Sequence, residues 1–416
     1  MTADKDCFVG FYKAGVIFPP ANRWKTAVRV FVLPFFTEFI MIGQYNNDLL
    51  SVKMSRSVIN RYTPDKVKWH YEHGLVMQSI YAVGRKYGIL EFPAWVKVMY
   101  DTKIDIDGAI HTYKNDEYNL DQINPGKNLF DLYNDTGDKK YLKAIELLKK
   151  QLDNQPRTQS GGFWHKKIYP WQMWLDGLYM QGPFYARYIR DISPEKDYED
   201  LVHQFELVYQ HTRNKDSGLL YHAWDESCKQ LWADPVTGCS PHFWGRAMGW
   251  FAMALTDVLS IIPDKETSYR KRLLDILLSL VAPVLSVQDK NSGLWYQVLD
   301  MPLRAKNYLE TSCSAMFTCF LYRIVHNNWL TDGDDKGVSA DAVLEAADKG
   351  WRGLCSRLSQ DVDGNLHLSG ICSVAGLGGN PYRDGSYDYY VKEPVVSDDF
   401  KGVGPFILAA LESEAI

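Results

Sequence analysis

Apolar residues recur at intervals of three and four along the chain from about residue 48, which is the spacing of one face of an α-helix. Proline and glycine interrupt this pattern between the predicted helices, for example at Pro125-Gly126 and Pro263. The pattern predicts an all-α protein with twelve helices, at 48–61, 70–87, 91–104, 124–136, 138–153, 171–190, 194–212, 240–262, 266–287, 308–328, 338–358 and 400–414.

A short unit recurs between pairs of the predicted helices. It consists of a glycine turn, a short apolar stretch and a polar side chain, and the polar residues are His111, His165, His222, Gln297 and His367. The turn glycines, Gly108, Gly162, Gly218, Gly293 and Gly364, are 54, 56, 75 and 71 residues apart, which leaves room for two helices each time. Six helical hairpins with a shared turn predict a closed six-hairpin toroid, an (α/α)6 barrel, because closing the ring buries each apolar face. The alternative is an open helical array, but such arrays have more uniform repeats and polar caps. In the toroid, the five polar side chains would lie on one rim.

The composition is that of an ordinary globular protein with many aromatic residues. The 416 residues carry 46 Lys and Arg against 51 Asp and Glu, a net charge of −5, so no basic surface for nucleic acid is expected. Aromatic residues make up 14% of the chain, which fits either a sugar-binding cleft or an aromatic core. The seven cysteines show neither a CxxC pair nor zinc-ligand spacing, so a disulfide framework or structural zinc is not expected. No linker is apparent, which predicts one barrel over residues 48–416.

Residues 1–47 form an N-terminal extension to which the sequence assigns no role. Its acidic start differs from the basic start of a signal peptide. The apolar run 28–42 is interrupted by Pro34 and Glu38 and is too short to span a bilayer. We expect it to be a buried segment; the alternatives are a cryptic export signal or a misplaced start codon.

The densest aromatic stretch, 163–184, contains a single aspartate, Asp176. Trp171, Trp174 and Tyr179 lie close to it in sequence. A carboxyl group among aromatic rings is expected to have a raised pKa, because burial disfavours its charged form. That property suits a general acid at neutral pH; the alternative is an aspartate that caps a helix.

Four further stretches carry candidate chemistry. His222 opens His-Ala-Trp-Asp-Glu, and Arg246 lies between Trp244 and Trp250. Arg246 is a candidate for binding a carboxylate in bidentate fashion, or else it pairs with a structural acid. Asp121 lies just before a predicted helix, where a capping role is equally reasonable. The Gly- and Tyr-rich segment 370–390 lacks the pattern of a phosphate-binding loop and is expected to line a cleft.

Four of these motifs together resemble glycoside hydrolase family 105, the unsaturated rhamnogalacturonyl hydrolases. They are WLDGLYMQGPF at 174–184, HAWDE at 222–226, FWGRAMGW at 243–250 and GLGGNPYRDGSYDYY at 376–390. The resemblance extends from about residue 48 to the end of the chain. It implies an (α/α)6 barrel, in agreement with the helix count, and makes residues 48–416 the catalytic domain.

The resemblance also implies a reaction. Members act on products of pectin-cleaving lyases, which carry a 4,5-unsaturated uronic acid at the non-reducing end. A proton is added to carbon 4 and water to carbon 5; the hemiketal then opens and releases a keto-deoxy-uronate. By motif, Asp176 is the acid and base and Asp121 the second catalytic aspartate. Substrate-binding positions match His165, Lys166, Trp174, His222, Trp244, Arg246, Trp250 and Tyr71. No metal or cofactor is implied.

The residues are chemically consistent with this reaction. Arg246 and Lys166 can receive a carboxylate and the tryptophans can wall a sugar ring, and hydration of an activated double bond needs one acid where an ordinary glycosidase needs two carboxylates. The alternatives are an unsaturated glucuronyl hydrolase, an ordinary inverting glycosidase and a non-catalytic sugar-binding toroid. A bacterial cytoplasmic or periplasmic location fits equally well, and neither the oligomeric state nor the neighbouring sugar follows from the sequence.

Overall fold

The computed structural model describes residues 48–330 and 337–415, all of which belong to one compact unit. The predicted N-terminal extension, with its apolar run 28–42, lies outside the described residues. No helix in the described part of the chain is long and apolar enough to cross a membrane.

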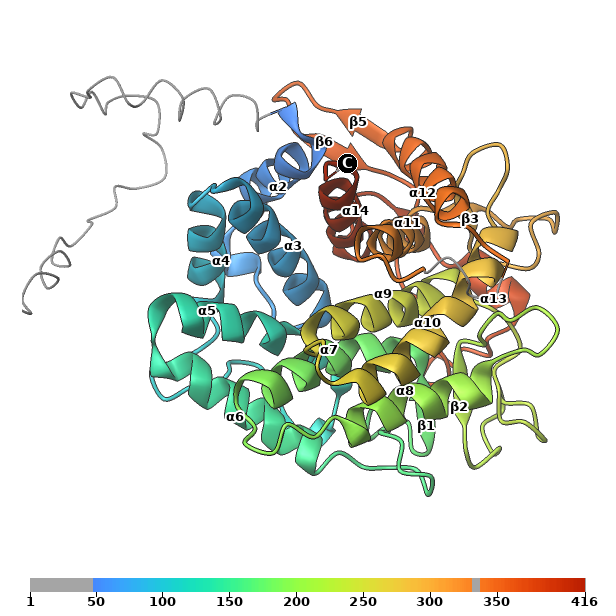
Figure 1. Cartoon of the computed structure of the whole chain (residues 1–416), viewed down its shortest axis with the longest axis horizontal. Coiled ribbons are helices and arrows are strands. Elements are labelled where there is room, and N and C mark those ends of the chain that lie inside the picture. The colour runs from blue at the N-terminus through green and yellow to red at the C-terminus, as the bar shows by residue number, and fades with distance from the viewer. Residues whose placement is uncertain (1–47, 331–336, 416) are drawn as a thin grey trace, which may run out of the picture. The chain divides into compact units, whose positions relative to one another are not determined.

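Twelve helices alternate between an outer and an inner ring (Figure 1). The outer helices are α2 (Leu50–Arg61), α4 (Glu91–Asp101), α6 (Lys139–Asp153), α8 (Glu199–Thr212), α10 (Thr267–Ser286) and α12 (Ala340–Cys355). The inner helices are α3 (Tyr71–Tyr87), α5 (Leu129–Thr136), α7 (Leu175–Asp191), α9 (Gly245–Ile261), α11 (Thr311–His326) and α14 (Phe400–Ser413). Each predicted helix therefore has a counterpart, and the all-α (α/α)6 barrel is confirmed.

The inner ring is closed. Helix α3 packs against α14 on one side and against η6 (Asn124–Asn128), the 3₁₀ turn that leads into α5, on the other. Helix α7 packs against η6 and α9, and α11 packs against α9 and α14. Because the last inner helix contacts the first, the described residues form a ring and not an open array.

Several predicted helices begin later than the periodicity indicates, because the residues before them pair as short strands. Helix α7 begins at Leu175, since β1 (Gln172–Trp174) pairs with β2 (Ala223–Asp225). Helix α11 begins at Thr311, since β4 (Leu309–Glu310) pairs with β3 (Trp295–Tyr296). Segment 370–390 contains β7 (Ile371–Cys372), which pairs with β8 (Val395–Val396), and ends in the short α13 (Tyr387–Lys392). The remaining predicted boundaries agree to within about five residues.

The recurring glycine unit is a hairpin that follows each of the outer helices from α4 to α12. Antiparallel pairing closes it at Ile104–Ile110, Arg157–Phe163, Arg213–Leu220, Gln288–Trp295 and between β5 (Leu358–Gln360) and β6 (Leu366–Leu368). A left-handed glycine stands in each turn, with φ of 72–93° at Gly108, Gly161, Gly218, Gly293 and Gly364. In the second turn this residue is Gly161, where the sequence predicted Gly162.

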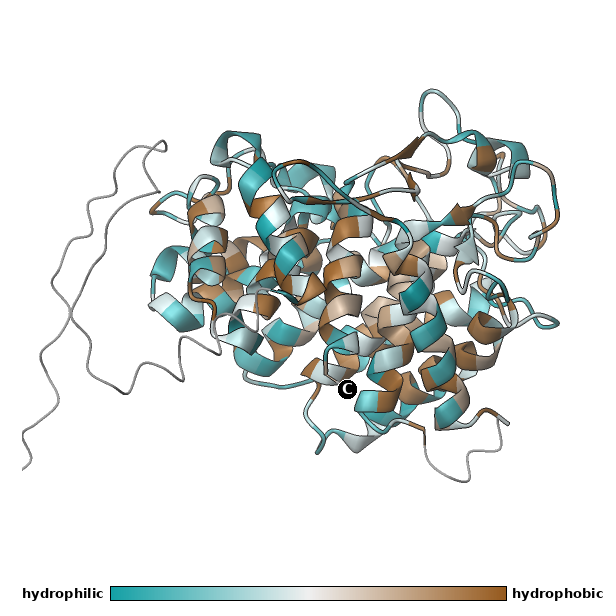
Figure 2. Cartoon of the chain, turned by 90° about the horizontal axis from the view of Figure 1, so that it is seen from above, coloured by the Kyte–Doolittle hydropathy of each residue, from teal (hydrophilic) through white to brown (hydrophobic). Residues whose placement is uncertain are grey.

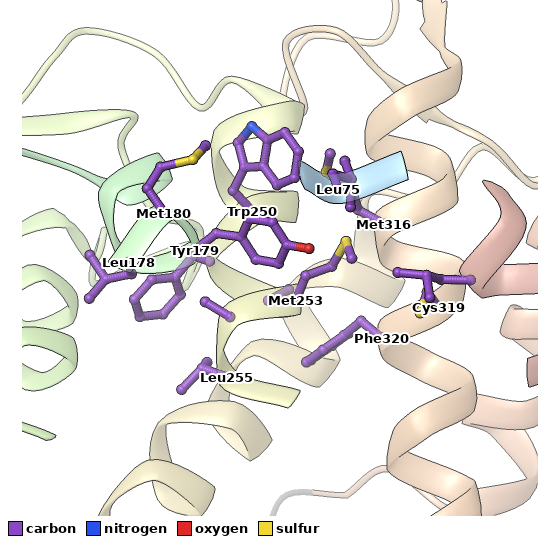
Figure 3. Packing of buried hydrophobic residues seen from close by; sticks show 14 of the residues in the cluster. Leu75, Leu178, Tyr179, Met180, Trp250, Met253, Leu255, Met316, Cys319 and Phe320 are labelled. Carbon is purple, nitrogen blue, oxygen red and sulfur yellow. The ribbon is translucent and has the colours of Figure 1, made fainter. Parts of the chain in front are cut away.

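The core lies between and inside the two rings, with apolar helix faces turned inwards and polar faces outwards (Figure 2). Tyr179 of α7, Trp250 and Met253 of α9 and Met316 of α11 meet at its centre (Figure 3). Gly249 allows α9 and α11 to approach closely, because a Cβ atom there would lie 2.8 Å from the Met316 sulfur. Much of the aromatic excess therefore belongs to the core.

Candidate active site

The predicted site residues gather at the N-terminal ends of the inner helices. Tyr71 is the first residue of α3, Asp176 the second of α7 and Arg246 the second of α9. Asp121 lies in η5 (Leu120–Gln122), just before η6. Helix N-termini carry partial positive charge and unpaired N–H groups, so this rim favours an anionic ligand.

Asp121 is a buried carboxylate held by three basic side chains. Its oxygens lie 2.6 Å from Lys166 Nζ, 3.5 Å from His165 Nε2 and 4.0 Å from His70 Nε2. Burial alone would raise the pKa of Asp121, but these neighbours outweigh it and lower the pKa to about 2. Asp121 is therefore an anion at neutral pH. The η5 turn is capped by Asn119, whose side chain accepts a hydrogen bond from the Asp121 N–H, so Asp121 is not the cap.

His165 lies between the two predicted catalytic aspartates. Its imidazole stacks on Trp174 with ring centres 4.6 Å apart, and both Asp121 and Asp176 act on its charge. Burial lowers the pKa of His165 to about 4, so the ring is neutral at neutral pH. Gly177 makes room for it, because a Cβ atom there would lie 3.2 Å from His165 Nδ1.

Asp176 faces His222 across a short gap. Asp176 Oδ2 lies 3.4 Å from His222 Nε2, and neither atom has a hydrogen-bond partner although both are buried. The other nitrogen of His222, Nδ1, is 2.7 Å from the hydroxyl oxygen of Tyr390. Helix α7 is capped by Trp174 without a side-chain hydrogen bond, so Asp176 does not cap it. Buried polar atoms normally have a partner, so the unpartnered Asp176 Oδ2 and His222 Nε2 are candidate contacts for a ligand or water.

Arg246 is paired with a buried acid. It is 1% exposed; its Nε donates to Ser312 Oγ at 2.7 Å and its Nη2 lies 3.4 Å from Glu310 Oε1. Nη2 also donates to the Cys372 carbonyl group, and Nη1 is 3.5 Å from the Ser373 carbonyl oxygen. Of the two roles considered for Arg246, pairing with a structural acid is therefore present, and Nη1 is the atom with most capacity left for a ligand.

The three tryptophan side chains that line the site are almost completely buried. Trp174, Trp244 and Trp250 are 5%, 1% and 1% exposed. Trp250 stacks on Tyr179 at 4.8 Å and meets the edge of Tyr71 at 6.0 Å. They shape the site chiefly through protein contacts.

The Gly-rich segment 376–390 lies beside these tryptophans. Arg383 donates from Nη2 to the Tyr169 hydroxyl at 2.8 Å, and Tyr169 stacks on Trp174 at 5.0 Å. The backbone of Arg383 pairs with Gly378, and Gly378 and Gly379 have φ of 62° and 83°, which glycine adopts without strain. These contacts join the segment to Trp174 through Tyr169, while its role in lining a cleft stays a prediction.

Of the five polar residues of the recurring turns, the structure brings three together. His165, His222 and Gln297 are buried, and the Gln297 side chain accepts from Trp244 and donates to the Tyr390 carbonyl oxygen. His111 is exposed, and His367 pairs with Asp398 at 2.6 Å. The buried group therefore contains three of the five predicted polar residues, and His111 and His367 are not part of it.

The two acidic residues of the His-Ala-Trp-Asp-Glu motif accept hydrogen bonds from backbone N–H groups of nearby loops. Asp225 accepts hydrogen bonds from the N–H groups of Ser227, Lys229 and Gln230, and Glu226 accepts from Ser160. The sequence did not single out Tyr390, Glu310 or His70 as members of the site. Their partners are distant in the chain, and only the crowded SYDYY motif drew attention to Tyr390.

Comparison with known proteins agrees with this geometry. The model of Glycosyl Hydrolase Family 88 matches residues 46–416. A solved structure described as a C. acetobutylicum ATCC 824 glycoside hydrolase from family 105 is 42% identical, covers 89% of this chain and 100% of that one, and has a TM-score of 0.84. The chain belongs to glycoside hydrolase family 105.

Two bacterial relatives are similar to parts of the chain. Protein Atu3128 of Agrobacterium fabrum is 42% identical over 56% of this chain and 97% of its own length. The unsaturated rhamnogalacturonyl hydrolase YesR of Bacillus subtilis is 32% identical over 47% of this chain and 55% of its own. The family 105 protein is thus a glycoside hydrolase of the unsaturated uronyl hydrolase type, as the motifs predicted.

Proposed function

We propose that this enzyme removes a 4,5-unsaturated uronic acid from the non-reducing end of pectic, rhamnogalacturonan-type oligosaccharides by hydrating the enol ether double bond. The observation that carries the proposal is the Asp176–His222 gap, where two buried, unpartnered polar atoms lie 3.4 Å apart. The resemblance to YesR supports the pectic substrate.

Asp176 is the group that moves the proton. It delivers a proton to carbon 4, which leaves positive charge at carbon 5 and the ring oxygen. Water adds to carbon 5 and returns a proton to Asp176. The hemiketal then opens and the resulting hemiacetal at carbon 1 expels the shortened sugar, so one water molecule is consumed in all.

Asp121 is not the proton donor, because its basic neighbours keep it ionised. With a pKa of about 2 it holds no proton to donate at neutral pH, so it acts as a hydrogen-bond acceptor that orients a sugar hydroxyl or the attacking water. His222, oriented by Tyr390, assists by holding the water or the Asp176 carboxyl group in place.

The remaining predicted residues hold the substrate. Lys166 and the helix N-termini offset the charge of the uronate, while Trp174, Trp244, Trp250 and Tyr71 shape the walls. His165 is neutral with its proton on Nε2, the nitrogen that faces the Asp121 carboxylate, so its unpartnered Nδ1 can accept a hydrogen bond from a sugar hydroxyl group. Nη1 of Arg246 donates a hydrogen bond to the substrate, and the ion pair with Glu310 holds the guanidinium group in place.

A panel of unsaturated disaccharides, followed by loss of the enol absorbance, tests this proposal. We expect turnover of unsaturated rhamnogalacturonan disaccharide, with saturated disaccharides unchanged. Activity confined to unsaturated chondroitin or hyaluronan disaccharides would assign the enzyme to glucuronyl substrates. Binding of any of them without loss of absorbance would indicate a sugar-binding toroid.

A further inference from the structure

A second cavity lies at the opposite end of the barrel from the candidate active site. It has a volume of about 410 Å³ and is lined by residues from the C-terminal halves of inner helices, among them Arg187 of α7, Asp257 of α9 and Arg323 of α11, together with Lys127 of η6. This volume is within the usual range of small-molecule sites, roughly 300–1,000 Å³.

Lys127 is an unusual residue in this cavity. It is 2% exposed, and its ammonium group donates to the Tyr179 hydroxyl at 2.9 Å. No ion pair joins Lys127 to a carboxylate in the described segments, which leaves hydrogen-bonding capacity on Nζ. Burial lowers the pKa of Lys127 to about 7, an effect that Asp257 opposes and Arg323 reinforces.

An acceptor without a partner lines the same cavity. Asp257 is 7% exposed; its Oδ1 accepts from Arg323, but its buried Oδ2 has no hydrogen-bond partner. Arg187 also lines the cavity, but both of its Nη atoms donate to Asp131 and its Nε lies 3.7 Å from Asp191 Oδ2, so Lys127 is the donor that the ligand would use. A cavity that combines a free donor and a free acceptor in buried positions suits a ligand that carries both kinds of group.

We propose that this cavity binds a small hydroxylated carboxylate, the chemistry of a free sugar acid. The carboxylate would accept from Lys127 Nζ, and a hydroxyl group would donate to Asp257 Oδ2. The arginines that line the cavity are paired with acids: Arg187 with Asp131, Arg190 with Asp191, and Arg323 with Asp257 and Glu412. Protonated Lys127 is therefore the lining cation whose charge is left for an anionic ligand.

This site is separate from the candidate active site. Tyr179 and Trp250 pack together in the core (Figure 3). Tyr179 accepts the Lys127 hydrogen bond and Trp250 contacts Tyr71 at the opposite rim, so the two rings lie between Lys127 and that rim. A ligand in the cavity and a substrate at the rim can therefore be bound together. Binding to the cavity is also independent of turnover.

Isothermal titration calorimetry with D-galacturonate on the full chain tests the inference. We expect binding that is about 20-fold tighter at pH 6.5 than at pH 8.5, with proton uptake, because only protonated Lys127 attracts the anion. Lys127→Met should abolish this pH-dependent binding of D-galacturonate. The matched variant Lys166→Met, at the opposite rim, should retain it.

Lys127→Arg provides a second test with a permanent cation. Its affinity should be equal at pH 6.5 and pH 8.5, provided that the melting temperature shows a folded protein. The proposal would be overturned if pH-dependent binding of D-galacturonate persists in Lys127→Met, or if neutral L-rhamnose binds equally tightly. It would also be overturned if the wild type does not bind D-galacturonate. None of these results depends on whether the unsaturated substrate is turned over.

Discussion

Asp176 Oδ2 and His222 Nε2 lie 3.4 Å apart without a hydrogen bond, while the far nitrogen of His222 is 2.7 Å from the Tyr390 hydroxyl. The Nδ1 side of the His222 ring is thus fixed by Tyr390, while Nε2 has no hydrogen-bond partner. Both facing atoms are buried and unpartnered, so each keeps a hydrogen-bonding position for the water or substrate that the proposed reaction needs beside Asp176.

Tyr390→Phe should lower kcat with little change in the fold. The variant removes the hydroxyl group that fixes the His222 ring and leaves a buried nitrogen unpaired, so we expect a loss of about tenfold in kcat, or about 1.4 kcal/mol. Steady-state kinetics on the unsaturated disaccharide measure it. Tyr387→Phe is the matched control, since the Tyr387 hydroxyl donates to the Arg304 carbonyl group instead. Equal effects of the two substitutions would argue against a role for Tyr390 in orienting His222.

Asp121→Asn should flatten the acid side of the stability profile. The pKa of Asp121 in the folded protein, about 2, is below the unfolded value of about 3.9. Its ion pairs therefore contribute about 2 kcal/mol above pH 4, a contribution that falls by about half at pH 3 and is lost below pH 2. Urea unfolding at pH 7, 4 and 3 should show a smaller decrease in unfolding free energy for the variant. An identical decrease would contradict the lowered pKa.

Glu310→Gln should destabilise the protein. Glu310 is fully buried, accepts from the N–H groups of Cys313 and Cys372, and pairs with Arg246. Removal of its charge leaves a buried guanidinium group without its counter-ion, so we expect a loss of about 3 kcal/mol in unfolding free energy. The exposed Glu146→Gln should change it by less than about 0.5 kcal/mol. A loss as small as that of Glu146→Gln would show that Arg246 does not depend on Glu310.

Gly177→Ala should impair substrate binding through His165. The new methyl group would lie 3.2 Å from His165 Nδ1 and 3.3 Å from Leu120, so the ring must shift. We expect kcat/KM to fall about tenfold, with a modest loss of stability. Gly182→Ala adds a methyl group 3.2 Å from the Phe205 ring on the same helix, away from the site. If Gly182→Ala lowers kcat/KM as much, the position of His165 is not the cause.

The sequence predicted the helical architecture because twelve amphipathic helices leave a strong periodic signal. It did not predict β1 and β2, which are three residues each and pair across about fifty residues of chain. The motifs located Asp121, Asp176, His165 and His222. They could not reveal that Tyr390 contacts His222 across 168 residues, nor choose between the two roles of Arg246, because both depend on tertiary contacts.

The most direct test of the central claim is the rate at which Asp176→Asn consumes the double bond of unsaturated rhamnogalacturonan disaccharide. Asparagine keeps the size of the side chain but cannot donate the proton, so we predict a fall in kcat of at least about 10³-fold. The melting temperature should stay near that of the wild type, and Asp107→Asn, at an exposed turn, should retain full activity. Substantial loss of absorbance by a folded Asp176→Asn protein would contradict the assignment of Asp176 as the acid.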